Sequence, residues 1–143
     1  MSQPTPSPTL QGLEILLGTW EMEVPRFPGV RGKATFAWPA EGAFLVHHSE
    51  VDHDAAPNAI MIIGGDQSDE TYCVLYSDAR GISRIYHMSL GAGVWKMWRD
   101  APDFYQRFTG TFSDDGGTIR GYWESSADGS TWEHDFDLTY TKQ

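Results

Sequence analysis

Turn-forming residues recur along the chain after Trp20 at intervals too short to leave room for long helices. The runs between them are roughly 6–10 residues long, the usual length of β-strands. The turn signals are Pro28-Gly29, 39–42, 56–58, 64–69, 78–81, 91–93, 100–103, 114–117 and Asp128-Gly129. This pattern predicts about ten short strands, and it excludes parallel βαβ units, which need a helix between strands.

Apolar and polar residues alternate within these runs, most clearly near the C-terminus. One expected face of the last run holds Trp132, His134, Phe136, Leu138 and Tyr140, and the other holds Glu133, Asp135, Asp137 and Thr139. Such alternation is typical of strands with one buried face. We therefore expect an all-β fold, a single antiparallel up-and-down β-barrel of about ten strands, because closure removes exposed sheet edges.

One segment departs from this alternation. The run Ile60 to Ile63 is apolar throughout, which predicts a strand that is covered on both faces.

The N-terminal segment has a different character from the rest. Residues 1–8 carry three prolines among small polar residues, which predicts a flexible tail, and residues 9–143 form the expected domain. Thr9 is a candidate N-cap, and leucines at 10, 13, 16 and 17 form one apolar stripe before Gly18. A single short helix is expected there, lying against one end of the barrel.

Charge and cysteine content exclude several functions. The chain has 143 residues and a formal net charge of −10, so we expect neither nucleic acid nor an anionic membrane as a partner. The one cysteine, Cys73, rules out an intramolecular disulfide and a cysteine-based zinc site. No signal peptide or long apolar segment is evident, which predicts a cytoplasmic protein.

Several motifs resemble those of the calycin superfamily, which includes lipocalins, fatty-acid-binding proteins and nitrobindin. The sequence Gly18-Thr19-Trp20 after a short helix is similar to the G-x-W entry of lipocalins. The chain resembles more closely a bacterial family of unknown function that is common in actinobacteria, and this resemblance covers nearly the whole domain. The segments that carry this closer resemblance are 76–81, 107–112 and 132–140, whereas 36–38 and 42–46 are similar to the early strands of the calycin superfamily. The resemblance implies a barrel that holds a small ligand, and nitrobindin suggests haem bound through a histidine of the last strand.

His134 is the main candidate for chemistry, because the alternation places it beside Trp132 and Phe136 on the apolar face. Three interpretations stay open: a core histidine with a buried partner, a polar contact for a ligand, and an axial ligand to haem iron. A histidine or tyrosine in the lumen could also catalyse proton transfer in an isomerase or cyclase.

Arginine and aromatic residues extend the expected site. Arg84 and Tyr86 share one strand face, and Arg107 is a further candidate. An inward arginine needs an anion, either a ligand carboxylate or a protein carboxylate such as Asp78 or Glu124, whereas an outward one needs none. Tryptophans 38 and 123 are expected to line the cavity.

A polar cluster offers a separate, metal-binding alternative. His48, Glu50 and Asp52 would share one strand face, where nitrogen and carboxylate donors could bind a divalent ion, although an exposed strand end is the simpler explanation. His48 is also included among the ligand-binding candidates. No phosphate-binding, zinc-protease or nucleophile-elbow motif is present.

The sequence therefore predicts binding of a small hydrophobic or amphipathic molecule in the lumen, with no resident cofactor. The alternatives are haem bound through His134 and an enzyme that uses a lumen residue. A homodimer is left open.

Overall fold

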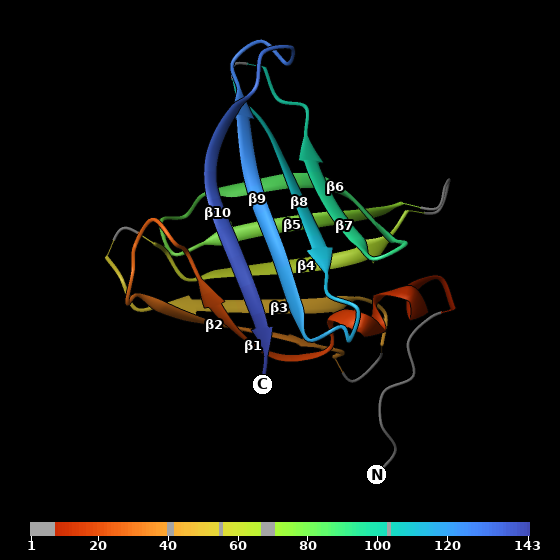
Figure 1. Ribbon diagram of the computed structural model, residues 1–143. Helices are drawn as coiled ribbons and strands as arrows, with labels where there is room; N and C mark the ends of the chain where they lie inside the picture. The colour runs from red at the N-terminus through yellow and green to blue at the C-terminus, as the bar shows by residue number, and fades with distance from the viewer. Residues whose placement is uncertain (1–7, 40–41, 55, 67–70, 103) are drawn as a thin grey trace.

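The strands predicted after the N-terminal segment form a closed ring (Figure 1). The computed structural model describes residues 8–143 except 40–41, 55, 67–70 and 103. The strands are β1 (Gly18–Glu23), β2 (Arg31–Ala37), β3 (Leu45–Val51), β4 (Ala59–Gly65), β5 (Tyr72–Asp78), β6 (Ser83–Gly91), β7 (Val94–Arg99), β8 (Tyr105–Phe112), β9 (Thr118–Ser126) and β10 (Glu133–Lys142). Each pairs antiparallel with the next and β10 returns to β1, which confirms the all-β, closed-barrel prediction.

The N-terminal helix η1 (Pro8–Leu16) closes one end of the barrel. It is a 3-10 helix, in which residues three apart lie above one another, so Leu10, Leu13 and Leu16 form a single buried row. The indole Nε1 of Trp20 donates a 2.8 Å hydrogen bond to the Leu16 carbonyl, which ties the helix to β1. The predicted tail lies outside the described residues, except for Pro8, which begins η1.

Aromatic rings fill the interior near this helix. Trp20, Phe36, Trp95 and Phe108 are almost fully buried, and the Trp95 ring lies 4.9 Å from that of Phe108 and 6.0 Å from that of Phe36. The Phe108 ring also lies over Gly121, where an added Cβ would sit only 2.6 Å from it. This half of the barrel is therefore a packed core.

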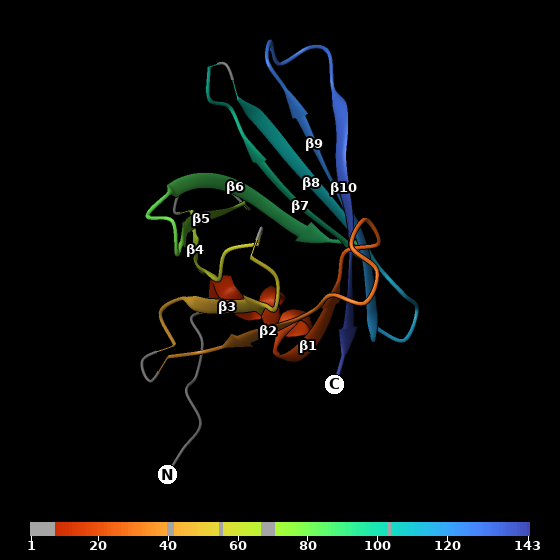
Figure 2. The ribbon, with the colours of Figure 1, turned by 90° about the vertical axis from the view of Figure 1, so that its left-hand side faces the viewer.

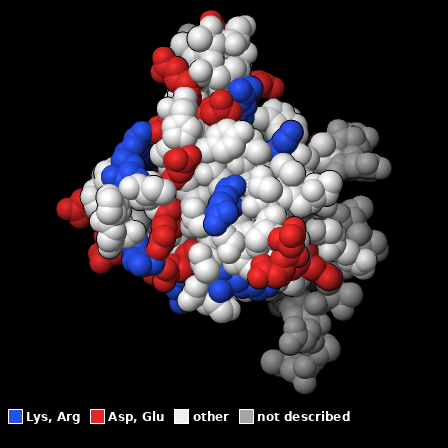
Figure 3. Space-filling model, in the orientation of Figure 1, with Lys and Arg blue, Asp and Glu red and all other residues white. Residues whose placement is uncertain are grey.

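In the view of Figure 1, strands β3–β6 run across the direction of β8–β10. The β7–β8 and β9–β10 hairpins project past the other strands, at the end opposite η1 (Figure 2). Acidic and basic side chains are interspersed over the outer surface of β8–β10 (Figure 3).

The expectation that Ile60 to Ile63 is covered on both faces is wrong within this chain. Met61 and Ile63 are buried inside, whereas Ile60 and Ile62 are exposed on the outside of β4. Strand β4 lies in a single curved sheet, and no other described element covers its outer surface.

Candidate functional site

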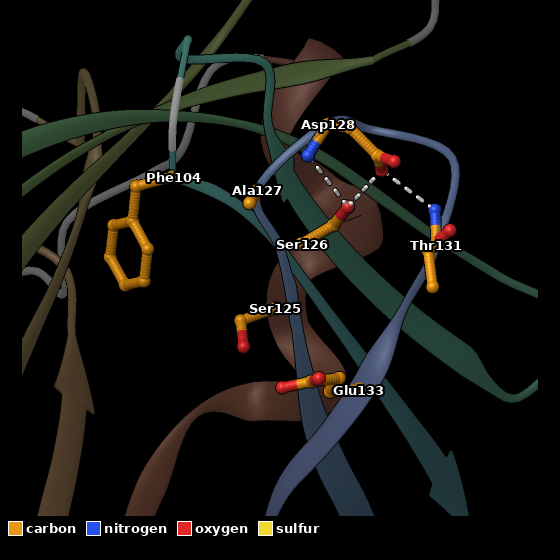
Figure 4. Close-up of a pocket in the computed structure, with 7 residues that line it drawn as sticks. All are labelled: Phe104, Ser125, Ser126, Ala127, Asp128, Thr131 and Glu133. Carbon is orange, nitrogen blue, oxygen red and sulfur yellow. Dashed lines mark hydrogen bonds between the residues drawn. The ribbon is translucent and has the colours of Figure 1, made fainter.

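The inner face of the barrel remains open at the end opposite η1. Gln106, Ser125 and Glu133 are register partners on β8, β9 and β10, and they continue this face beyond the aromatic core. A hollow of about 340 Å³ lies there, which we call the mouth hollow (Figure 4). Its lining residues are Phe104, Ser125, Ser126, Ala127, Asp128, Thr131 and Glu133.

The β9–β10 loop gives the mouth hollow a preformed wall. The Asp128 carboxylate accepts 2.8 Å hydrogen bonds from the backbone N–H groups of Ser130 and Thr131, and the Ser126 hydroxyl donates to it. These hydrogen bonds, those from Thr131 and Ser130 foremost, hold the pKa of Asp128 below its usual range. Gly129 completes the turn at a φ of 78°, a conformation that favours glycine.

A second hollow, the side hollow, opens where β6 separates from β7. Pairing between these strands begins at His87 with Trp98, so the first residues of β6 have no partner on β7. The side hollow measures about 360 Å³ and is lined by Ser83, Arg84, Ile85, His87, Arg99, Asp100 and Ala101. The Arg84 guanidinium lies 5.2 Å from the centre of the Phe104 ring and so connects the two hollows.

Tyr86 lies below both hollows, at the border of the packed core. Its hydroxyl donates a 2.7 Å hydrogen bond to Gln106 Oε1, and its ring meets that of Trp123 edge-on at 5.7 Å. Burial raises the pKa of Tyr86, although the guanidinium groups of Arg84 and Arg99 act in the opposite direction. The residue is therefore a neutral phenol that offers an aromatic surface and a fixed hydroxyl.

A second tyrosine extends the aromatic surface. The Tyr76 ring lies 6.3 Å from that of Tyr86, and its hydroxyl donates a 2.8 Å hydrogen bond to Asp78. Burial, together with the bond to Asp78, raises the pKa of Tyr76 to about 12. The Asp78 carboxylate also pairs with Arg80, which holds its pKa well below the usual range. The Asp78 carboxylate thus already has two partners within the chain, Tyr76 and Arg80.

Two arginines reach the site without a carboxylate partner. Neither Arg84 nor Arg99 forms an ion pair with any carboxylate in the described part of the chain. The Nε atom of Arg99 is buried and has no hydrogen-bond partner there. A buried donor without a partner is costly, so this position favours an acceptor supplied from outside the chain.

The predicted inward position of His134 is wrong. Strand β10 has a bulge, because His134 pairs with Glu124 while Phe136 pairs with Trp123, which leaves Asp135 as an extra residue. An extra residue reverses the faces on its two sides. His134 is consequently on the outer surface, where its Nε2 lies 2.8 Å from the Asp137 carboxylate, while Phe136 packs against the core.

The same bulge moves Trp132 to the outer surface. Arg107 also lies outside, with its guanidinium 3.9 Å from the centre of the Trp132 ring and its Nε 2.8 Å from Glu124. The expectation that these two residues line the lumen is therefore wrong. Of the alternatives for Arg107, the structure shows the one in which it pairs with Glu124.

His48 is also on the outer surface, contrary to its expected place in a ligand site. Its Nδ1 lies 3.8 Å from the Glu50 carboxylate, as neighbours on one strand face would. No group of three or more metal-binding side chains occurs among the residues that the structure describes, so the divalent-ion alternative with Asp52 is not assembled.

Four predicted residues lie on the inner side as expected. Arg84, Tyr86, Trp123 and Phe136 gather at the open end, and Trp38 packs against the core just past β2. Sequence reasoning did not select Gln106 or Phe104 for the site. Gln106 shares the inner face of β8 with Phe108, and Phe104 comes directly before β8 in the same alternation, so the sequence already contained the signal.

The structure thus defines a class: an antiparallel barrel with one end closed by a helix and the other open. Comparison of the sequence with family models and with curated proteins finds no match. Among solved structures, the crystal structure of Rv2717c from M. tuberculosis is similar, with a TM-score of 0.70 over 97% of this chain and 99% of that one. The two sequences are 15% identical, so this likeness concerns the fold. No described helix is long and apolar enough to cross a membrane.

Proposed function

We propose that this protein binds a small amphipathic molecule at the open end of its barrel. The observation that carries the proposal is the pair of arginines without carboxylate partners beside an aromatic inner surface. The packed core below Tyr86 keeps the ligand in the open half of the lumen.

The dimensions of the site favour a small ligand. The mouth hollow of about 340 Å³ is near the lower end of the usual size of small-molecule sites. The rings of Phe104, Tyr86 and Trp123 offer apolar surface for a hydrocarbon part of the ligand. Aromatic lining with a few fixed polar groups is typical of such sites.

The arginines favour an acidic head group. A guanidinium donates paired hydrogen bonds to a carboxylate or phosphate, and such charge-assisted bonds are stronger than neutral ones. The net charge of −10 repels an anion at long range. Salt screens that repulsion beyond about 8 Å, whereas the arginines act at contact.

Decanoate and decanol test this proposal by isothermal titration calorimetry. We expect decanoate to bind and decanol to bind about tenfold more weakly, because the alcohol lacks the charged head group. Arg84→Gln and Arg99→Gln should weaken decanoate alone, whereas Phe104→Ala should weaken both ligands. Acetate, which has the head group without the chain, should not bind measurably.

Two substitutions on the outer face of β9 serve as controls. Tyr122 is 38% exposed, close to the 40% of Phe104, so Tyr122→Ala matches Phe104→Ala in size and exposure. Arg120→Gln matches the arginine variants and should leave decanoate binding unchanged. Failure of both ligands to bind, or binding that Phe104→Ala leaves intact, contradicts the proposal.

The haem alternative requires His134 in the lumen. Because His134 lies outside and contacts Asp137, we do not extend the proposal to haem. The enzyme alternative calls for a histidine or tyrosine in the lumen, and Tyr86 is such a residue. Its hydroxyl is bound to Gln106, and we do not extend the proposal to catalysis by it.

A further inference from the structure

The outer face of β4–β6 carries no charged side chain. Its residues are Ile60, Ile62, Gly64, Cys73, Leu75, Ser77, Ser83, Ile85, His87 and Ser89, none of which is Asp, Glu, Lys or Arg. Charged residues make up 21% of the chain, and they are frequent on the outer faces of β8–β10 (Figure 3). A stretch of solvent-facing sheet without charge is therefore a specific feature of these three strands.

A continuous apolar row crosses this face. Val46, Ile62, Leu75 and Ile85 are successive register partners on β3, β4, β5 and β6. Ile62, Leu75 and Ile85 are 39%, 42% and 60% exposed, and Ile60 beside them is 45% exposed. Exposed apolar side chains that touch across several strands mark an interaction surface, whereas single ones do not.

We infer that this face is where two copies of the chain associate into a homodimer. Two bodies of net charge −10 repel each other, so they can pack closely only through a surface that has no acidic excess. The outer face of β4–β6 meets that requirement, and depletion of charge is characteristic of the buried centre of interfaces. Two such sheets would pack face to face, as in a sandwich.

The border of the face also suits a second copy. Lys33 pairs in register with Glu50 on the β2–β3 side, and Lys96 and Asp100 lie on the β7 side. All four are exposed. Because each border carries both signs, a copy related by two-fold symmetry can bring opposite charges together around the apolar centre.

Sedimentation velocity over a range of concentrations tests the inference without any ligand. We expect the unmodified protein to dimerise in the micromolar range and Leu75→Asp to remain monomeric. Tyr122→Asp introduces the same change on the outer face of β9, at a residue of similar exposure, and should leave the dimer intact. Circular dichroism of each variant shows whether it is folded.

Cys73 provides a second measurement on the unmodified chain. It is exposed on this face and is the only cysteine, so its reaction with a thiol reagent reports coverage of the face. We expect the reaction to slow as the protein concentration rises. A monomer at all concentrations overturns the inference, and so does a dimer in which Cys73 reacts at an unchanged rate.

Discussion

At the scale of single residues, His47 is the least expected feature of the barrel wall. It lies on the inner face of β3, is almost fully buried, and neither ring nitrogen has a hydrogen-bond partner among the described residues. The Phe36 ring is 4.7 Å away. Burial, with a smaller effect of His48, lowers the pKa of His47 to about 3, so the imidazole is neutral in the folded protein.

His47 should make the protein sensitive to mild acid. In the unfolded chain the imidazole titrates near 6.5, so the unfolded state binds a proton that the folded state excludes. The free energy of unfolding therefore falls as pH drops from about 6.5 towards 3, by on the order of 4 kcal/mol from this residue. Urea titrations of the unmodified protein and His47→Met at several pH values should show a flatter dependence in the variant.

The neighbouring His48 is the natural control for that measurement. It is exposed on the outer side of the same strand, and His48→Met should retain the slope of the unmodified protein. If the His47→Met and unmodified curves stay parallel between pH 7 and 4, the imidazole does not cause the acid sensitivity.

At the scale of secondary-structure elements, the bulge in β10 decides which residues reach the interior. On its C-terminal side, Phe136, Leu138 and Tyr140 face inward, as their alternation predicts. On its N-terminal side, the faces are exchanged, and Glu133 lies beside Ser125 at the mouth hollow. The bulge thus places an acidic side chain, rather than an imidazole, at the site.

Two alanine substitutions measure this exchange of faces. Phe136→Ala should reduce the free energy of unfolding by about 2–3 kcal/mol, because it removes a ring that packs against the core. His134→Ala should change it by less than about 0.5 kcal/mol, because an exposed contact with Asp137 contributes little. Chemical denaturation measures both values. Equal losses would mean that His134 is as buried as Phe136.

The outcome at β10 shows what a sequence of this kind can predict. Residue alternation and turn spacing sufficed for the strands and their closure, and the spacing of Leu10, Leu13 and Leu16 sufficed for the helix. The bulge depends on how β10 pairs with β9, a long-range property that period-two alternation does not contain. For the same reason, the sequence predicts Arg84 at the site but does not predict the contact of its guanidinium with the Phe104 ring.

At the scale of the whole molecule, closure depends on pairing between the first and last strands. Residues 20–23 of β1 pair with residues 139–142 of β10, which leaves no free sheet edge among the described strands. The ammonium group of Lys142 also lies 5.4 Å from the centre of the Trp20 ring. A few residues at the end of β10 therefore complete the ring.

Removing residues 139–143 should abolish the cooperative fold. The deletion removes every β1–β10 register pair and the core residue Tyr140, and it exposes the edges of both strands. Deletion of Gln143 alone costs one backbone hydrogen bond to Thr19 and should leave a folded barrel. Near-ultraviolet circular dichroism and thermal melting distinguish the two. A cooperative melt of the shorter chain would show that closure is dispensable.

The pairing of Trp20 with Lys142 also bears on how the protein is made. During synthesis on a ribosome, β1 is available long before its partner in β10 has emerged. Contacts between residues so distant in sequence slow folding, because a long loop must be ordered before they form. We expect the barrel to stay incomplete, with Trp20 unshielded, until β10 has left the ribosome, so the need for chaperones should be greatest just before that point.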